Sequence, residues 1–387
     1  MQMIRYSSCT AAKLYSLYKA ISKAFLCQTR CLFERMFSVR TLEGPYFCFA
    51  MACLQLLFLL LMYQRSSSSW SGAFMEKLPD KWDYSKLHDV YFNLSFFSPA
   101  STEDLHYCPP KSPLLVGPIK VNFHNVPNMK RIIRKNPYVQ RGGLYTPRHC
   151  VAQYKTAILV PHRNRETHLR QLLYFLHPFL QRQQLHYRIY VINQAGNGTF
   201  NRAKLLNIGV REALKDDEWD CLFLHDVDLI PENDYNLYVC DELCPKHVSS
   251  AMNKFNYRLP YRNFFGGVTA VTPEQYLRMN GFPNSYWGWG GEDDEIANRV
   301  HYAGMNIVRV PLDIGRYKMI KHGPDEGNNA NEKRFDMLTK SYKYWKVDGM
   351  NSLEYKCISK QLTSLYTNIT ADIGEAPIED KNSAPES

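Results

Sequence analysis

Residues 156–165 read TAILVPHRNR, and this stretch decides the fold. Thr156–Val160 is a short apolar run of the kind that forms a buried strand, and the basic segment Pro161–Arg165 follows it directly. The next apolar residues keep the spacing of an amphipathic helix: Leu169, Leu172, Leu173, Leu176, Phe179 and Leu180. We expect Asn164 to cap this helix and Pro178 to kink it or end it early.

The same order of elements continues along the chain. Residues 188–193 (RIYVIN) and 221–225 (CLFLH) have the composition of strands, and residues 203–215 between them have the spacing of a helix. This alternation is typical of an open α/β nucleotide-binding sheet, whose ligands bind beyond the carboxyl ends of its strands. Neither GxGxxG nor GxxxxGK[ST] occurs in the sequence, which argues against a dinucleotide fold and a P-loop.

Polar residues follow each predicted strand at this edge of the sheet. Asn193-Gln194 and then Phe200–Arg202 follow the second strand, and Asp226-Val-Asp228 follows the third. Because side chains alternate along a strand, the two aspartates should point the same way, one toward a divalent cation and the other toward a sugar hydroxyl. Arginines and an acid pair in one crevice favour a phosphate ligand with a metal. The alternative is a solvated turn, which Pro231–Asp234 resembles.

A second distinctive stretch is Tyr286–Glu295, YWGWGGEDDE. Its glycines allow the backbone to approach a ligand closely, and exposed tryptophan rings stack on the apolar faces of sugars. The four acids precede residues 296–300, which have a helical pattern, and acids are favoured in the first turn of a helix. That structural role explains some of the acids but neither the tryptophans nor the glycines, so the stretch predicts a sugar-binding loop.

The N-terminal residues predict a membrane anchor. Residues 45–63 carry no charge and are just long enough to span a bilayer, and seven Lys/Arg against two Glu precede them. The positive-inside rule predicts a cytoplasmic tail (1–44), a transmembrane signal-anchor (45–63) and a luminal stem (64–107). A cleaved signal peptide is the alternative, but it fits poorly because the apolar segment starts far from the N-terminus and no clear cleavage site follows. The polar residues 375–387 read as a disordered tail.

A luminal location gives meaning to sequons and cysteines after the span. The sequons begin at Asn93, Asn197 and Asn368, and glycosylation requires a lumen or the cell exterior. An oxidising lumen would also hold Cys108, Cys150, Cys221, Cys240, Cys244 and Cys357, none of which forms a CxxC zinc pattern. The formal charge of +10 is concentrated partly in the N-terminal tail, so we expect no nucleic-acid partner.

Residues 108–374 resemble the β-1,4-galactosyltransferases, and most closely the members that act on N-acetylglucosamine (GlcNAc). The resemblance rests on motifs in this order: PHRNR (161–165), FNRAKLLN (200–207), HDVDLIPEND (225–234), FFGGV (264–268), GFPNSYWGWGGEDDE (281–295), MIKH (319–322) and NEKRFD (331–336). It implies a Rossmann-like nucleotide-diphospho-sugar transferase domain of the GT-A type, an α/β fold with a mixed sheet. It also implies inverting transfer of galactose from UDP-galactose to O4 of a terminal GlcNAc on a glycoprotein or glycolipid, with Mn²⁺.

The resemblance assigns roles to single residues. Asp293 would be the base that takes the proton of O4. The implied metal ligands are Asp228, Met319 and His322, although thioethers favour softer metals than manganese. The implied donor-binding residues are Pro161, Arg163, Arg165, Phe200, Arg202, Asp226, Val227, Lys254, Phe264, Gly267, Trp289 and Glu292. The implied acceptor-binding residues are Tyr261, Trp289, Gly291, Asp293, Asp294, Arg334, Phe335 and Leu338. The implied disulfides are Cys108–Cys150 and Cys221–Cys240, which leave Cys244 and Cys357 without an assigned partner.

Three features of the sequence modify this expectation. Phe264 occupies a position where a large ring would crowd a 2-acetamido group and so favours galactose, but it lacks the hydroxyl of a tyrosine. Glu295 stands where close relatives usually carry a third aspartate. The polar stretch Lys321–Lys333, KHGPDEGNNANEK, lies between metal and acceptor positions. We expect it to be a lid that orders when donor and metal bind, rather than a plain disordered loop.

Rival functions remain open at the level of the sequence. A β-1,4-N-acetylgalactosaminyltransferase using UDP-GalNAc is the nearest alternative. A metal phosphohydrolase needs two bridged metals and gives no reason for paired tryptophans. A non-catalytic carbohydrate-binding surface receptor could lose Asp293 or Asp228, yet both are present. Topology and resemblance together imply a single-pass Golgi membrane protein with a luminal catalytic domain, and homodimerisation through the stem is possible in principle.

Overall fold

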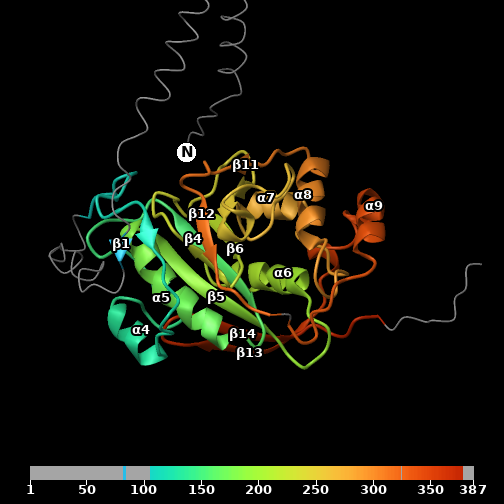
Figure 1. Cartoon of the computed structure of the whole chain (residues 1–387), viewed down its shortest axis with the longest axis horizontal. Coiled ribbons are helices and arrows are strands. Elements are labelled where there is room, and N and C mark those ends of the chain that lie inside the picture. The colour runs from blue at the N-terminus through green and yellow to red at the C-terminus, as the bar shows by residue number, and fades with distance from the viewer. Residues whose placement is uncertain (1–81, 84–104, 324, 378–387) are drawn as a thin grey trace, which may run out of the picture. The chain divides into compact units, whose positions relative to one another are not determined.

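A computed structural model describes residues 82–83, 105–323 and 325–377 (Figure 1). The predicted cytoplasmic tail, membrane span and disordered tail, except for residues 375–377, lie outside this part, as do most of the stem and Asn93. Within the described ranges no helix has both the length and the apolar character needed to cross a bilayer.

The described chain is a mixed α/β structure built on one large sheet (Figure 1). The strands of this sheet, in spatial order, are β11 (Val308–Arg309), β8 (Lys246–His247), β10 (Val268–Val271), β6 (Cys221–His225), β4 (Lys155–His162), β5 (His186–Gln194), β14 (Thr367–Asp372) and β13 (Lys356–Leu362), and β3 (Leu144–Tyr145) also pairs with β5. The strands β6, β4, β5 and β14 run parallel, whereas β10 and β13 run antiparallel to their neighbours. The expected mixed sheet is therefore present.

Smaller elements surround this sheet. A three-stranded sheet contains β7 (Leu229–Pro231), β12 (Arg316–Met319) and β9 (Ala251–Met252), and β1 (Trp82–Asp83) pairs with β2 (Ile119–Lys120). The helices are α4 (Met129–Lys135), α5 (Glu166–Arg182), α6 (Arg202–Ala213), α7 (Pro273–Arg278), α8 (Glu292–Tyr302) and α9 (Arg334–Tyr344), with 3₁₀ turns η1 (Asn253–Phe255) and η2 (Met350–Ser352).

The strands and helices predicted between residues 156 and 225 are all present, with two local corrections in α5. Asn164 does not cap the helix, because it adopts a left-handed backbone with φ of 52°, and Arg165 precedes the first turn. Pro178 does not end the helix, which continues to Arg182. Almost every residue of α5 from Leu172 onward is buried, so tertiary packing outweighs the local cost of a helical proline, about 3 kcal/mol.

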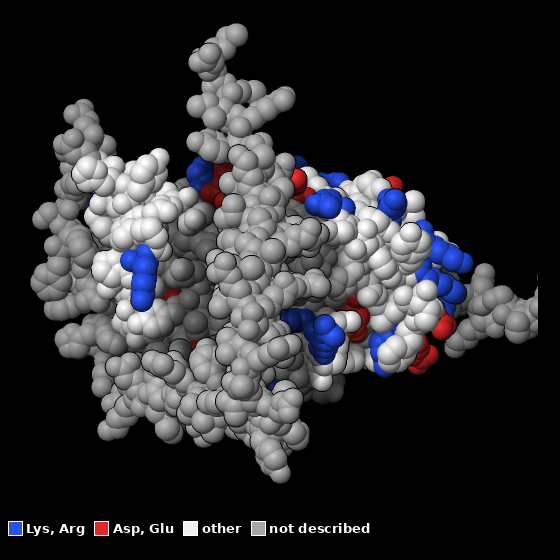
Figure 2. All heavy atoms as spheres, turned by 90° about the horizontal axis from the view of Figure 1, so that it is seen from above, with Lys and Arg blue, Asp and Glu red and all other residues white. Residues whose placement is uncertain are grey.

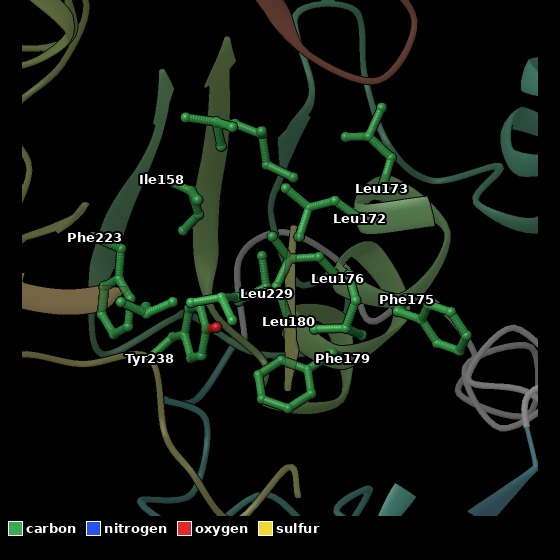
Figure 3. Packing of buried hydrophobic residues seen from close by; sticks show 14 of the residues in the cluster. Ile158, Leu172, Leu173, Phe175, Leu176, Phe179, Leu180, Phe223, Leu229 and Tyr238 are labelled. Carbon is green, nitrogen blue, oxygen red and sulfur yellow. The ribbon is translucent and has the colours of Figure 1, made fainter. Parts of the chain in front are cut away.

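The core has two parts, one on each face of the large sheet, because side chains alternate along its strands. Ile158 and Val160 of β4 belong to the cluster that α5 covers, whereas Ala157 and Leu159 belong to the cluster with α6. Figure 3 shows the first cluster, in which Leu176, Phe179 and Leu180 of α5 face Tyr238, Phe223 and Ile158. The rings of Phe223 and Tyr238 are stacked with centroids 4.1 Å apart.

Both implied disulfides are present. Cys108 bonds Cys150, and Cys221 bonds Cys240, while Cys244 and the exposed Cys357 are free thiols. Cys221 is the first residue of β6, so its disulfide braces the strand that leads into the Asp226-Val-Asp228 segment.

The segment after this strand is not the solvated turn that Pro231–Asp234 suggested. The Asp234 side chain is fully buried and lies 2.6 Å from the Nε of Arg182 in α5. It also accepts hydrogen bonds from the backbone N–H groups of Val116 and Gly117. A short polar pattern cannot reveal such a role, because the partners lie 52 and 117 residues away.

The charged surface is mixed. On the described part of the face in Figure 2, lysine and arginine side chains are separated by uncharged and acidic residues and form no continuous basic field. The positive formal charge therefore does not gather there into a stripe that would track a phosphate backbone.

Candidate active site

A cavity of about 460 Å³ lies at the carboxyl ends of β4 and β6. All twelve predicted donor-binding residues line it, together with Asp293 and the three predicted metal ligands. Several further residues that line the cavity had no individual binding role assigned from the sequence: His168, Leu229, Met252, Phe255, Asp325, Glu326 and Asn328. Of these, Asp325, Glu326 and Asn328 belong to the predicted lid, so their position in the chain was the only signal available.

One arginine holds three acids at the centre of this cavity. Arg202, the first residue of α6, places its Nε 2.7 Å from Asp226 and its Nη1 3.0 Å from Asp293. The same Nη1 lies 3.7 Å from Glu292. Burial alone would lower the pKa of Arg202, but the three carboxylates together raise it. Burial also raises the pKa of Glu292 to about 7, with a further contribution from the neighbouring charge of Asp293.

The four consecutive acids separate in space at the start of α8. Glu292 and Asp293 face the cavity, and Asp294 accepts a hydrogen bond of 2.6 Å from the hydroxyl of Tyr261. Glu295 turns into the core, where its Oε1 lies 2.9 Å from Nε of Arg299 one helical turn later. Glu295, the departure from the usual aspartate, is therefore a structural acid whose partner is on the same helix.

Glycines set the position of these acids. Gly291 precedes the helix with φ of 94°, and a Cβ at this residue would lie 2.9 Å from Cε1 of Tyr286. A larger residue would have to adopt a strained backbone and displace the tyrosine ring. The neighbouring Trp289 remains 57% exposed, as a platform for a sugar ring requires.

The predicted metal ligands converge on one wall of the cavity. Asp228 Oδ2 lies 3.1 Å from Nε2 of His322, and Met319 pairs with Leu229 in the small sheet. The backbone N–H of Ile320 donates to the carbonyl of Asp228 over 2.8 Å. Asp226 and Asp228 themselves occupy a turn between β6 and β7 rather than the extended strand we expected, and strand alternation does not explain why both reach the cavity.

The predicted metal ligands fit a divalent cation in part. A carboxylate and an imidazole are ligands that suit manganese, whereas the thioether of Met319 is a soft donor. The hydrogen bond to Asp228 raises the pKa of His322, so a cation there would compete with a proton. Across the residues that the structure describes, no group of three His, Cys, Asp or Glu side chains forms a metal-binding cluster.

The predicted lid lies against the aromatic residues of the cavity. The backbone of Trp289 forms hydrogen bonds with Asn329 and Asn331, and the N–H of Phe200 donates to Gly327 over 2.8 Å. Arg163 donates to the carbonyl of Glu326, and Arg165 forms an ion pair with Asp325. Two donor-side arginines thus contact the segment, which is the arrangement expected of a closed lid. Its movement stays a prediction.

The remaining acceptor-side residues lie outside the cavity, near the first turns of α8 and α9. Arg334 and Phe335 begin α9, the guanidinium lies 4.5 Å from the ring centroid, and Phe335 is 63% exposed. A Cβ at Gly290 or Gly291 would touch the side chain of Arg334, so the glycine loop and α9 pack closely. Leu338 follows on the same helix and is half-buried.

The two sequons within the described residues differ in environment. Asn197 is exposed in the loop after β5, and the next residue, Gly198, accepts a hydrogen bond from Arg163. Asn368 lies on β14, and its side-chain oxygen accepts a hydrogen bond from Asn193. Glycosylation at either residue stays a prediction.

The mixed sheet and the cavity of acids, cations and aromatic rings define the class as a glycosyltransferase. A profile described as the N-terminal region of glycosyl transferase group 7 matches residues 108–241, and one described as the N-terminal domain of galactosyltransferase matches residues 246–323. β-1,4-Galactosyltransferase 3 of Bos taurus is 58% identical over 346 residues and that of Homo sapiens 57% over 343 residues; each alignment covers 87% of both chains. The chain belongs to the β-1,4-galactosyltransferase family.

A solved structure supports the fold. The catalytic domain of Drosophila β-1,4-galactosyltransferase 7, in complex with xylobiose, is 31% identical to this chain with a TM-score of 0.50. The match covers 58% of this chain and 95% of the Drosophila chain. The protein is therefore a galactosyltransferase with a GT-A-like fold.

Proposed function

We propose that this protein transfers galactose from UDP-galactose to O4 of a terminal GlcNAc, with inversion and with Mn²⁺. The observation that carries the proposal is the position of Asp293. Its carboxylate lines the donor cavity, and its chain neighbour Asp294 is bound to Tyr261 on the acceptor side. A single base between the two substrates fits one in-line displacement, in which the acceptor oxygen attacks the anomeric carbon as its proton leaves.

Arg202 prepares Asp293 for this role. Its Nη1 contact of 3.0 Å keeps the carboxylate oriented before the acceptor arrives. The proton of the acceptor hydroxyl passes to Asp293 as the new glycosidic bond forms. The leaving group is UDP, and the cationic side chains of Arg163, Arg165 and Lys254 in the same cavity would stabilise its diphosphate.

Asp228, Met319 and His322 would hold the Mn²⁺ ion. A bound divalent cation supplies charge neutralisation for the leaving diphosphate. The pairing of Asp228 with His322 supports two of these three ligands, and the place of Met319 on the same wall supports the third.

The acceptor would be a GlcNAc-terminated glycan. Trp289 and Phe335 are exposed aromatic rings, which suits binding of a sugar face and of an N-acetyl group. The Drosophila relative with xylobiose supports a sugar acceptor in general. The surface around the acceptor site would select the class of glycan that binds.

The cell location we propose is the Golgi membrane. The charge and hydropathy of residues 1–63 favour a single-pass type II anchor with the catalytic domain in the lumen. The two disulfides in the domain fit an oxidising compartment. Residues 64–107 would be a stem, which could also join two copies as a homodimer.

Donor choice gives the first prediction. The Phe264 ring lines the cavity and should exclude a 2-acetamido group, so Phe264→Leu should raise transfer from UDP-GalNAc by about tenfold relative to UDP-galactose. Initial rates with both donors measure this. An unchanged donor ratio would show that the ring does not exclude the larger sugar.

The proposal is tested with the purified full-length chain, Mn²⁺, UDP-galactose and free GlcNAc. We expect a disaccharide whose NMR spectrum shows a β1–4 linkage. UDP-GalNAc in place of UDP-galactose tests the alternative donor. No galactosylated product, an α linkage, or faster transfer from UDP-GalNAc would contradict the proposal.

A further inference from the structure

One turn serves both substrates. Between η1 and β10, residues 261–264 form a turn in which the N–H of Phe264 donates to the carbonyl of Tyr261. Phe264 lines the donor cavity, while the hydroxyl of Tyr261 donates to Asp294 on the acceptor side. The two rings pack edge to face with centroids 5.4 Å apart. A displacement of this turn would therefore disturb donor and acceptor contacts together.

Arg309 holds this turn through hydrogen bonds to its backbone carbonyls. Its Nη1 donates to the carbonyl of Phe264 and its Nη2 to the carbonyl of Arg262, each over 2.6 Å. A planar guanidinium is suited to such a fork of two acceptors. Among the described residues no carboxylate forms an ion pair with Arg309, and burial lowers its pKa. The charge of this half-buried side chain is thus directed at backbone carbonyls.

His247 and Arg309 together form a clamp that holds the turn at residues 261–264. His247 lies beside Arg309, because β8 and β11 pair in parallel with these two residues in register. Its Nδ1 accepts from Nη1 of Arg309, so Nε2 carries the proton and donates to the carbonyl of Gly266 over 3.0 Å. Burial lowers the pKa of His247 to about 3, in keeping with a neutral ring. The His247 ring also packs edge to face on Phe264, with centroids 5.6 Å apart.

The clamped segment borders the reacting carboxylate. A Cβ at Gly266 would collide with the carboxylate of Asp293 and lie 2.8 Å from Cζ of Phe264. The tip of the phenylalanine ring and Asp293 therefore flank the same glycine. A ring that moved away from this position would open space beside the sugar of the donor.

We infer that Arg309 is a positioning residue for substrate selection: its guanidinium fixes the turn that sets Phe264 against the donor and Tyr261 against the acceptor. The inference rests on the proposed function. Without the clamp the turn can shift, the exclusion of a 2-acetamido donor weakens, and the hydroxyl that orients Asp294 is displaced. The Phe264 ring is therefore necessary for donor choice, but it excludes the larger donor only when Arg309 holds it in place.

The test compares donor selectivity in full-length variants. For wild type, Arg309→Met, Arg309→Lys and the matched control Arg258→Met, kcat/KM is measured with UDP-galactose and with UDP-GalNAc. Arg258 is exposed in the same loop, so its substitution should leave selectivity unchanged. We expect the preference for UDP-galactose to fall about tenfold in Arg309→Met and less in Arg309→Lys. The KM for GlcNAc should rise in Arg309→Met.

A double variant separates the clamp from a general loss of structure. If Arg309 acts through the ring, Phe264→Leu with Arg309→Met should be no less selective than Phe264→Leu alone. The ratio of two donors in one preparation does not depend on the fraction of folded protein. A ratio within about twofold of wild type in Arg309→Met, or in Arg309→Lys if only that variant folds, would overturn the inference. Wild type that transfers no galactose would overturn the proposed function and the inference with it.

Discussion

Glu292 shows at the residue scale how the cavity changes the chemistry of a side chain. It is buried beside Asp293 and Asp226, and all three acids share the guanidinium of Arg202. Burial, followed by the charge of Asp293, raises the pKa of Glu292 to about 7 from 4.5. One positive charge thus faces three carboxyl groups, and protonation of Glu292 relieves part of the repulsion.

This shift predicts a pH dependence of stability. Because the folded pKa exceeds the unfolded value, Glu292 takes up a proton on folding between these two pH values. Protonated Glu292 stabilises the folded protein below about pH 4.5, and this stabilisation is lost as the pH rises through about 7. Relative to that of Glu292→Gln, the free energy of unfolding of the wild type should therefore fall by on the order of 1–3 kcal/mol between these two pH values.

Thermal unfolding of both proteins across this range, in metal-free buffer, measures the effect. Glu166→Gln is a suitable control, because this acid on α5 is exposed. Parallel pH curves for wild type and Glu292→Gln would contradict the assigned environment of Glu292.

Residues differed in how far the sequence could predict their place. Asp228 and Trp289 stand in short patterns whose chemistry is legible, and both line the cavity. Met319 reaches it only because β12 pairs with β7, which joins residues 90 positions apart. Arg309 carries no local signal, since its partners are backbone carbonyls about 45 residues earlier. Such contacts depend on strand pairing that a single sequence does not display.

At the scale of elements, the segment 321–333 joins the metal side of the cavity to α9. Its backbone pairs with Trp289 and Phe200, and Arg163 and Arg165 contact it from the donor side. These contacts would tighten around a bound nucleotide sugar and loosen in its absence.

Limited trypsin digestion tests this lid. Lys321 and Lys333 are exposed at its two ends, and cleavage after them should slow when Mn²⁺ and UDP-galactose are added together. Lys111 is exposed and distant from the lid in the sequence, so it should be cleaved at the same rate in both conditions. Equal cleavage of the lid with and without ligands would contradict lid closure.

The elements themselves were predictable where periodicity is strong. The strands around 156–160, 188–193 and 221–225 and the helices between them all formed, because buried strands and amphipathic helices have clear patterns. The continuation of α5 past Pro178 was not predictable, since the burial of the helix end supplies the compensating energy. The turn at Val227-Asp228, between the end of β6 and the start of β7, has no comparable pattern in the sequence.

At the scale of the whole described domain, Arg182 and Asp234 join distant parts of the chain. The pair is fully buried at 2.6 Å, and Asp234 also binds the backbone N–H of Gly117. It thus links the end of α5, the segment after β7 and the chain near β2. Removing one partner leaves a charge buried without its counter-ion.

We predict that Arg182→Met destabilises the protein by about 3–5 kcal/mol. The matched control is Lys155→Met, which removes the exposed ion pair with Asp217 and should cost less than about 1 kcal/mol. Urea unfolding followed by tryptophan fluorescence compares the two. Equal losses for both variants would show that burial of the pair contributes nothing.

The central claim is that Asp293 is the base of galactosyl transfer, and Asp293→Asn tests it most directly. Asparagine keeps the shape but cannot take a proton, so kcat should fall by about 10²- to 10⁴-fold while the KM for UDP-galactose changes little. The control Asp336→Asn, an exposed acid on α9, should retain wild-type kcat. An Asp293→Asn enzyme with kcat within tenfold of wild type would contradict the account.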